Sequence, residues 1–197
     1  MIWVVVASFA AASIAVVHAI RQEKRAIESL SHQVIAQWRQ LRQTMLERHL
    51  IVGSLLDLLP NHPLLDYGKQ ELEGCNRIAE ASVRNFEIEL AGRGECTEMC
   101  RAQDRFIDSL FHMTNAIEQG SLFTSQKGIA ACLRGLESQQ KKIDESKATY
   151  NASVIVYQAS LVSRKSPRLP RFASKPLELQ ELSFGWTGSD IETLTPA

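Results

Sequence analysis

The positions of proline constrain the fold of this chain more than any other feature of its sequence. All six prolines lie at positions 60, 63, 167, 170, 176 and 196, so residues 1–59 and 64–166 contain none. Because proline removes a helix hydrogen bond and clashes with the preceding turn, such long proline-free stretches favour long helices. No stretch keeps a sustained alternation of apolar and polar residues, so the sequence predicts an all-α fold without a sheet.

The first twenty residues predict a transmembrane anchor. Residues 2–20 contain no Lys, Arg, Asp or Glu, and nineteen helical residues span roughly 28 Å, close to the ~30 Å hydrocarbon core of a bilayer. A cleaved signal peptide is the alternative, but it has basic residues before its apolar core, and this run has none. Arg21, Lys24 and Arg25 follow directly, so the positive-inside rule predicts a single-pass protein of the inner or plasma membrane, with its N-terminus outside and the rest cytoplasmic.

Residues 21–163 predict a bundle. Helices are expected over about 21–59, 64–91, 96–119 and 124–163, separated by turns at 60–63, 92–94 and 120–121. In the first and last of them, apolar residues recur every three or four positions, which is typical of a bundle or a coiled coil. Short connections make consecutive helices antiparallel. We therefore expect an up-down four-helix bundle whose first and last helices are long, with a free seam on which a second copy could pair.

The tail, residues 164–197, has its charges in two blocks. The first block has no acid and five basic residues: Arg164, Lys165, Arg168, Arg171 and Lys175. The second, from residue 176 on, has four acids and no basic residue. Two interpretations stay open, a solvated irregular tail and a polybasic segment on anionic lipid. Phe184 and Trp186 could dock on the bundle, the membrane or a partner, and the sequence does not decide among these.

Two spacings in the predicted bundle carry a family resemblance. The residues concerned are Trp38, Arg48 ten positions later, and, in the last predicted helix, Tyr150, Asn151, Val154 and Tyr157. Together with the apolar run, this pattern resembles the LemA family of bacterial membrane-anchored helical proteins. The chain departs from the family's pattern at Gly53, where the family has proline, at Gln140, where it has Glu, and in lacking a Phe-Pro motif after the last helix. The resemblance implies a helical bundle on an anchor and no known chemistry.

Three polar residues fall on seam positions, where a charge is costly unless it is paired. They are Arg48, Gln140 and Lys147. At ~1.5 Å per residue, Arg48 and Gln140 lie about 40 and 35 Å from the membrane end, and Trp38 and Lys147 both lie near 25 Å. We therefore predict a contact between Arg48 and Gln140 and a cation–π contact between Lys147 and the Trp38 ring. The alternative is that the long basic side chains reach out between the helices to solvent.

No constellation in the sequence indicates catalysis, a cofactor or a metal. Cys96 and Cys100 are one helical turn apart but lack a matching histidine, so they are expected to be small buried residues. Zero net charge argues against a nucleic-acid partner. The sequence therefore favours a membrane-anchored scaffold or adaptor with unknown protein partners and no enzymatic activity. The alternative is a receptor or enzyme with a small-molecule site inside the bundle near Arg48, Gln140 and Lys147.

Overall fold

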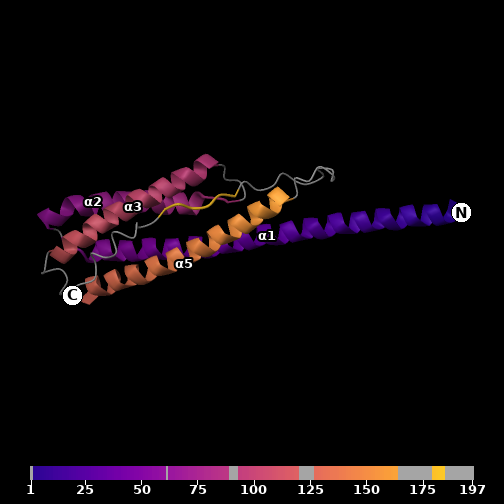
Figure 1. Cartoon of the computed structure of the whole chain (residues 1–197). Helices are drawn as coiled ribbons and strands as arrows, with labels where there is room; N and C mark the ends of the chain where they lie inside the picture. Colours follow the sequence, from indigo (N-terminus) through magenta and orange to yellow (C-terminus); the bar gives the residue numbers. More distant parts are fainter. Residues whose placement is uncertain (1, 61, 89–92, 120–126, 164–178, 185–197) are drawn as a thin grey trace.

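The structure is a computed structural model that describes residues 2–60, 62–88, 93–119, 127–163 and 179–184 (Figure 1). In this part of the chain there are four α-helices and no strand, as predicted. The helices are α1 (Ile2–Leu58), α2 (Pro63–Asn85), α3 (Arg93–Gln119) and α5 (Lys127–Ser163). They alternate in direction, so the up-down order of the helical bundle is confirmed (Figure 1).

The apolar run and the first bundle helix form one continuous helix, because nothing in residues 2–58 breaks it. Its first part extends well beyond the other helices (Figure 1). Among the residues that the structure describes, no helix is long and apolar enough to span a membrane. The side chains of residues 2–12, which make up more than half of the predicted anchor, lie outside the described part.

The core is built from the predicted seams. On α1 and at the residue that follows it, the buried seam residues are Val34, Trp38, Leu41, Met45, Arg48, Val52, Leu55 and Leu59, none more than 3% exposed. On α5 the corresponding buried residues are Ile129, Leu136, Ile143, Tyr150, Val154 and Tyr157. The spacing of three and four residues thus identified the buried face of both long helices, because the helical period places such residues on one stripe.

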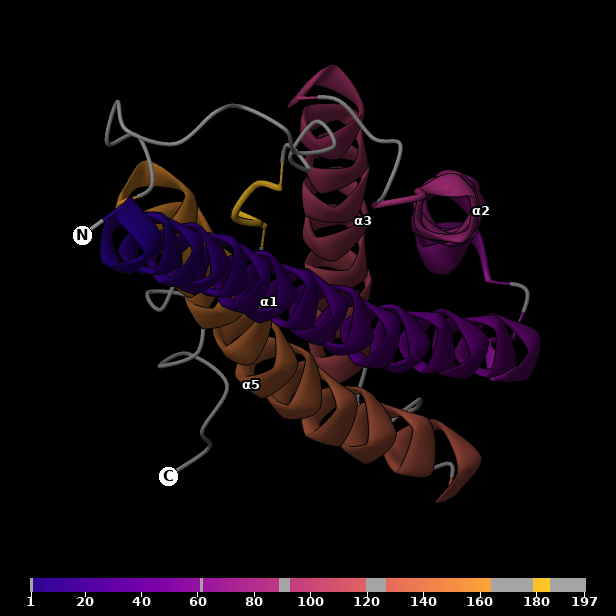
Figure 2. The same ribbon diagram turned by 90° about the vertical axis from the view of Figure 1, so that its right-hand side faces the viewer.

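The helices pack as two pairs rather than as a closed square. α1 packs mainly on α5, α2 mainly on α3, and the two pairs are joined along α1 and α2. α3 and α5 do not pack closely along their length, and residues 179–184 run between them (Figure 2). Leu179, Leu182 and Phe184 of this segment are buried in the common core. The predicted irregular tail therefore contributes to the fold, and Phe184 docks on the bundle.

α2 ends at Asn85, six residues earlier than predicted. Phe86 leaves the helix and packs edge-on against Trp38 of α1, with 5.0 Å between ring centroids. Arg42 of α1 donates a hydrogen bond of 2.5 Å to the carbonyl oxygen of Arg84. That carbonyl is in the last turn of α2, where carbonyls lack partners within the helix. Contacts with α1, which local sequence does not report, thus set this helix end.

The packing predicts unequal effects for two leucines of α1. Leu41 is fully buried, whereas Leu50 is 64% exposed. Leu41→Ala is expected to lower the free energy of unfolding of the full chain by about 2–5 kcal/mol, because it leaves a cavity in the core. Leu50→Ala serves as the matched control and is expected to change it by less than about 0.5 kcal/mol. Chemical unfolding followed by circular dichroism measures both, and equal effects would contradict this register of α1.

Candidate functional site

Arg48 is the largest fully buried side chain in the described structure. Its Nη1 donates to Gln140 Oε1 of α5 at 2.8 Å, and its Nη2 donates to Gln103 Oε1 of α3 at 2.7 Å. Gln103 in turn donates to the backbone carbonyl of Ala79 in α2, at 3.0 Å. The predicted contact between Arg48 and Gln140 is therefore present. One guanidinium and two carboxamides connect all four helices at one level of the bundle.

The electrostatics of this layer keep the guanidinium charged. Burial lowers the pKa of Arg48 to about 10, and the negative charge of Asp144 opposes the shift. Asp144 accepts hydrogen bonds of 3.2 and 3.3 Å from Gln140 Nε2. The carboxamide of Gln140 therefore lies between a buried cation and a partly exposed carboxylate. The Phe106 ring adds a cation–π contact, with its centroid 4.9 Å from the guanidinium carbon.

His49, the next residue on α1, links α1 to α2 beside this layer. Its Nδ1 lies 2.8 Å from Asn76 Oδ1, and Asn76 Nδ2 donates to the His49 carbonyl at 3.5 Å. Since the amide nitrogen of Asn76 donates, its oxygen accepts, and His49 Nδ1 must carry the proton. Burial, together with the nearby charge of Arg48, lowers the pKa of His49 to about 4. Neither His49 nor Asn76 stands out in the sequence, because an isolated histidine gives no spacing signal.

The second predicted contact is wrong in its partner. Lys147 lies over the ring of Phe184, 5.2 Å from its centroid, and not over Trp38. Its Nζ also donates to the Phe184 carbonyl oxygen and lies 3.6 Å from Asp144 Oδ1. Trp38 packs instead on Tyr150, one turn further along α5, with ring centroids 6.1 Å apart. The predicted register of α1 and α5 is thus correct. The ring that Lys147 contacts belongs to Phe184 of the tail, which the prediction did not include.

Tyr150 and Asn151 of α5 hold the tail segment by its backbone. Asn151 Nδ2 donates to the Leu182 carbonyl at 3.0 Å, and the Leu182 N–H donates back to Asn151 Oδ1 at 2.9 Å. Tyr150 donates its hydroxyl to the Gln180 carbonyl at 2.9 Å. These backbone bonds can hold an extended segment whatever its side chains are. The specificity for this segment comes from its buried apolar residues, Leu179, Leu182 and Phe184.

Gln158, about two turns further along α5, extends this contact. Its Nε2 donates to the Leu179 carbonyl oxygen at 2.8 Å. Tyr157, the last motif residue, is buried in the core. A signal for the docked segment was present in the sequence, since Leu179, Leu182 and Phe184 are apolar residues within six positions of a polar tail. Docking of Phe184 was one of the alternatives that the sequence left open, but Leu179 and Leu182 were not included in it.

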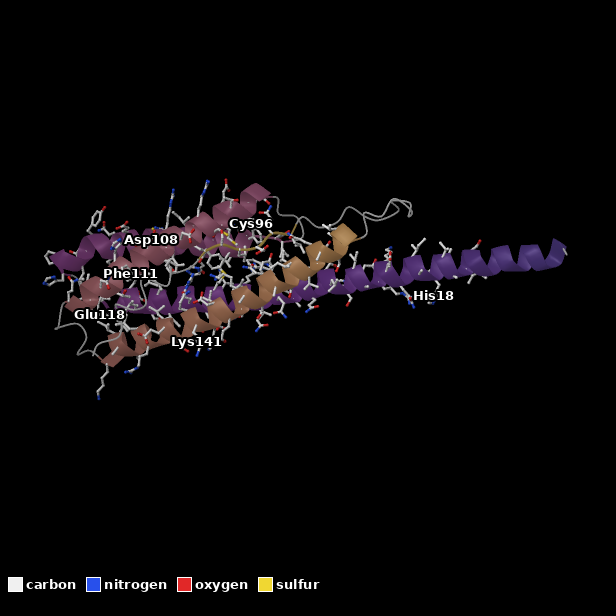
Figure 3. All side chains as sticks on the ribbon, viewed as in Figure 1. His18, Cys96, Asp108, Phe111, Glu118 and Lys141 are labelled. Atoms are coloured by element: carbon white, nitrogen blue, oxygen red, sulfur yellow. The ribbon has the colours of Figure 1, made fainter. Side chains whose placement is uncertain are left out.

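The predicted membrane-surface residues fall into two groups. Arg21, Lys24 and Arg25 are exposed on α1, in the part that no other helix covers. Figure 3 shows His18 on this same projecting part. The remaining five, Arg164, Lys165, Arg168, Arg171 and Lys175, lie outside the described residues.

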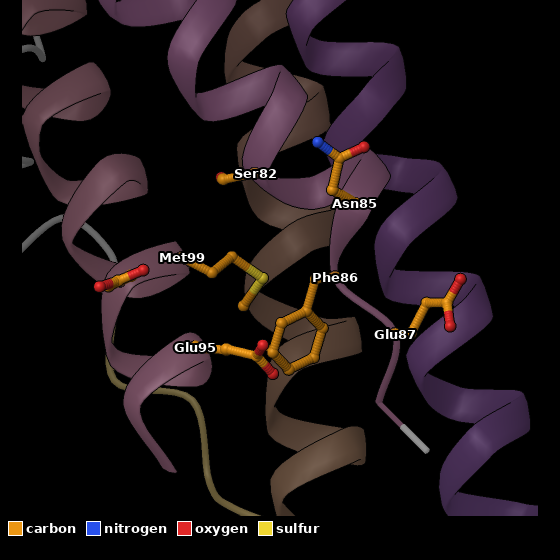
Figure 4. Close-up of a pocket in the computed structure, with 7 residues that line it drawn as sticks. Ser82, Asn85, Phe86, Glu87, Glu95 and Met99 are labelled. Carbon is orange, nitrogen blue, oxygen red and sulfur yellow. The ribbon is translucent and has the colours of Figure 1, made fainter. Parts of the chain in front are cut away.

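A pocket of about 340 Å³ lies apart from the predicted polar layer, where α2 ends and α3 begins (Figure 4). Phe86 and Met99 give it an apolar side, and Glu87, Glu95 and Glu98 give it a negative one. In the described part of the chain, no group of three or more His, Cys, Asp or Glu residues has the geometry to hold a metal ion.

No model of a known protein family matches this chain, and neither a curated protein nor a solved structure is similar to it.

The layer predicts a strong coupling between Arg48 and Gln140. We expect a double-mutant cycle of Arg48→Met and Gln140→Leu to give a coupling energy on the order of 1–3 kcal/mol, because either single change leaves a buried polar group without a partner. Urea unfolding of the four proteins measures it.

The exposed pair Arg84 and Glu80 is the matched control for this cycle. It makes an ion pair of 2.7 Å within one turn of α2, with Arg84 56% exposed. Its coupling is expected to be about 0.3–0.5 kcal/mol, because solvent screens the interaction. A value for Arg48 and Gln140 no larger than this control would show that the layer is not an energetic unit.

His49 predicts a specific loss of stability in acid. Its pKa is about 4 in the folded protein against an ordinary value of 6.5, so the unfolded chain binds more protons between these two values. The free energy of unfolding is therefore expected to fall by about 3 kcal/mol as the pH drops from about 6.5 to about 4, and His49 adds nothing further below that. His49→Gln should remove this part of the pH dependence in urea unfolding. His32→Gln, at an exposed position of α1, should leave it unchanged.

Proposed function

We propose that this protein is a membrane-anchored helical scaffold that acts through protein and membrane contacts rather than catalysis. The observation that carries the proposal is the projecting part of α1. Residues 13–26 are exposed along their whole length, and Ile14 is 70% exposed. A long helix with an apolar exposed surface needs a cover, and the uncharged run of residues 2–20 suits a bilayer.

The basic residues beside the run support a cytoplasmic bundle. Arg21, Lys24 and Arg25 begin one residue after it, and in that stretch Glu23 is the only acid. This bias favours a single-pass topology with the N-terminus outside the inner or plasma membrane. α5 ends on the side of the bundle that faces the projecting part of α1 (Figure 1). The basic block after Ser163 would therefore begin toward the same membrane surface, where it could bind anionic lipid.

The pairing of the buried polar groups within the bundle supports the scaffold role. Both terminal nitrogens of the Arg48 guanidinium bind protein oxygens, which is typical of a layer that fixes helix register. Exposed apolar side chains are spread over the described bundle helices, among them Tyr67 and Ile78 on α2 and Val156 on α5. Such surfaces suit partner proteins or a second copy of the chain. Membership of the LemA family, which rests on the motif residues alone, forms part of this proposal.

A second candidate, a receptor or enzyme with a small-molecule site, rests on two atoms. Arg48 Nε and His49 Nε2 are buried and have no hydrogen-bond partner in the described structure. A small polar ligand or a water molecule could satisfy them. The two functions are separated by thermal unfolding of the full chain with a panel of small polar metabolites. A ligand that raises the Tm of the parent protein, but not that of Arg48→Met, would favour the receptor.

The anchor predicts membrane association that two arginines abolish. The full chain should sediment with membranes and resist extraction by alkaline carbonate. Placing two arginines in the run, as Ala11→Arg with Ile14→Arg, should release it, because each arginine in the hydrocarbon core costs roughly 2.5–3.5 kcal/mol. The matched control is Leu50→Arg with Ile78→Arg, two exposed positions on the bundle, and it should stay with the membrane. Release of both variants, or of neither, would contradict the anchor.

The topology and the partners are tested separately. Protease added to intact cells should leave the C-terminus uncut if the bundle is cytoplasmic. Crosslinking in membranes, followed by pull-down from detergent, should return discrete partners or a dimer of the chain itself. Monomeric protein alone after crosslinking would argue against a scaffold.

A further inference from the structure

The docked segment, residues 179–184, covers a pair of cysteines on α3. Cys96 and Cys100 are one turn apart, in hydrogen-bond contact with each other, and only 6% and 7% exposed. The backbone N–H of Ser183 donates to the sulfur of Cys100. Figure 3 shows Cys96 at the end of α3 beside which the segment passes. The segment therefore lies directly against Cys100, and its backbone at Ser183 lowers the pKa of that thiol.

The two thiols are not equivalent. The Cys96 thiol donates to Cys100, and this hydrogen bond lowers the pKa of Cys100 against the opposing effect of burial. The same bond, together with burial, raises the pKa of Cys96. Cys100 is therefore the sulfur that loses its proton more readily, and the thiolate is the nucleophilic form of cysteine. Cys96 stays protonated and stabilises it.

We propose that Cys100 is a thiol-modification site that the docked segment gates, and that its partner class is a low-molecular-mass disulfide. The segment leaves Cys100 inaccessible while Leu182 and Phe184 are buried. When the segment opens, the Cys100 sulfur is exposed to solvent. The proposal stands on the geometry of α3 and the tail, and it does not depend on the membrane anchor.

The chemical step is a thiol–disulfide exchange. Cys100 loses its proton to solvent, and its thiolate attacks one sulfur of the small disulfide. A new S–S bond forms to Cys100, the old S–S bond breaks, and the other half leaves as a thiolate that takes up a proton. The exchange needs no further oxidant. Reduction by a small thiol reverses it, so the modification can respond to the thiol balance of its compartment.

Modification and docking exclude each other. The group added to Cys100 would occupy the place of the Ser183 backbone, in a core with a buried residue on each side of it. The segment could then no longer bury Leu182 and Phe184 or form the two hydrogen bonds to Asn151. Modification thus holds the segment away from α5 and leaves the contact residues of α3 and α5 free.

The gate is tested with oxidised glutathione on the full chain, following each cysteine by mass spectrometry. In Leu182→Ser with Phe184→Ser, Cys100 should form its mixed disulfide about tenfold faster than in the parent protein or more, because the open state no longer has to be reached by undocking. Glu181→Ala is the matched control, since this side chain of the same segment is exposed. Cys75 and Cys132, both partly exposed, report on general unfolding and should react at unchanged rates. Equal rates at Cys100 in the parent protein and in both variants would show that the segment does not control access to Cys100, and the proposal would fail.

The effect of Cys100 modification on docking can be tested without changing residues 179–184. Protease that cuts after glutamate should cleave the parent protein slowly at Glu181, and faster after Cys100 has been glutathionylated and excess reagent removed. Treatment with reduced glutathione should restore the slow rate. Cys100→Ser exposed to the same reagents should keep the slow rate throughout. Protection of Glu181 that is unchanged by modification would show that the segment and the thiol are independent, and the proposal would fail.

Discussion

Arg48 brings a positive charge into a core that is otherwise mostly apolar, and the protein has to solvate that charge with its own groups. Gln140 and Gln103 do so from two different helices, and Gln103 passes the contact on to the backbone of α2. Each helix can slide along its apolar stripe at little cost, but it cannot slide past a hydrogen bond to a buried guanidinium. The register of the bundle therefore depends on this layer more than on any single apolar contact.

The two-pair packing has a consequence for the tail. Because α3 and α5 do not pack closely along their length, a hydrophobic strip of the core would face solvent if nothing covered it. Residues 179–184 cover it, held by the Tyr-Asn motif of α5 through their backbone. Tyr150 and Asn151 of α5 thus have a physical role in this chain, the attachment of an extended segment. The same segment places the backbone of Ser183 on Cys100, which joins the fold to the chemistry of a thiol.

The projecting part of α1 and the part of α1 inside the bundle form one continuous helix. A force or contact at either end is therefore transmitted through a continuous hydrogen-bonded rod. Such a rod would hold the binding surfaces of the proposed scaffold at a fixed distance from the proposed anchor. The pocket beside Phe86 and Met99 lies apart from the Arg48 layer.

The sequence by itself determined the helical class, the buried stripes and the level of the Arg48–Gln140 contact, because a helix has a fixed period and a fixed rise and both can be counted along the chain. It did not determine the end of α2, the partners of Lys147 and His49, or the docking of Phe184. Arg42 of α1 binds the carbonyl oxygen of Arg84 at the end of α2. Lys147 contacts Phe184, thirty-seven residues further along the chain. The contacts of Phe184 and Lys147 depend on the gap that the helices leave between α3 and α5. That gap follows from packing in three dimensions, and no local spacing in the chain encodes it.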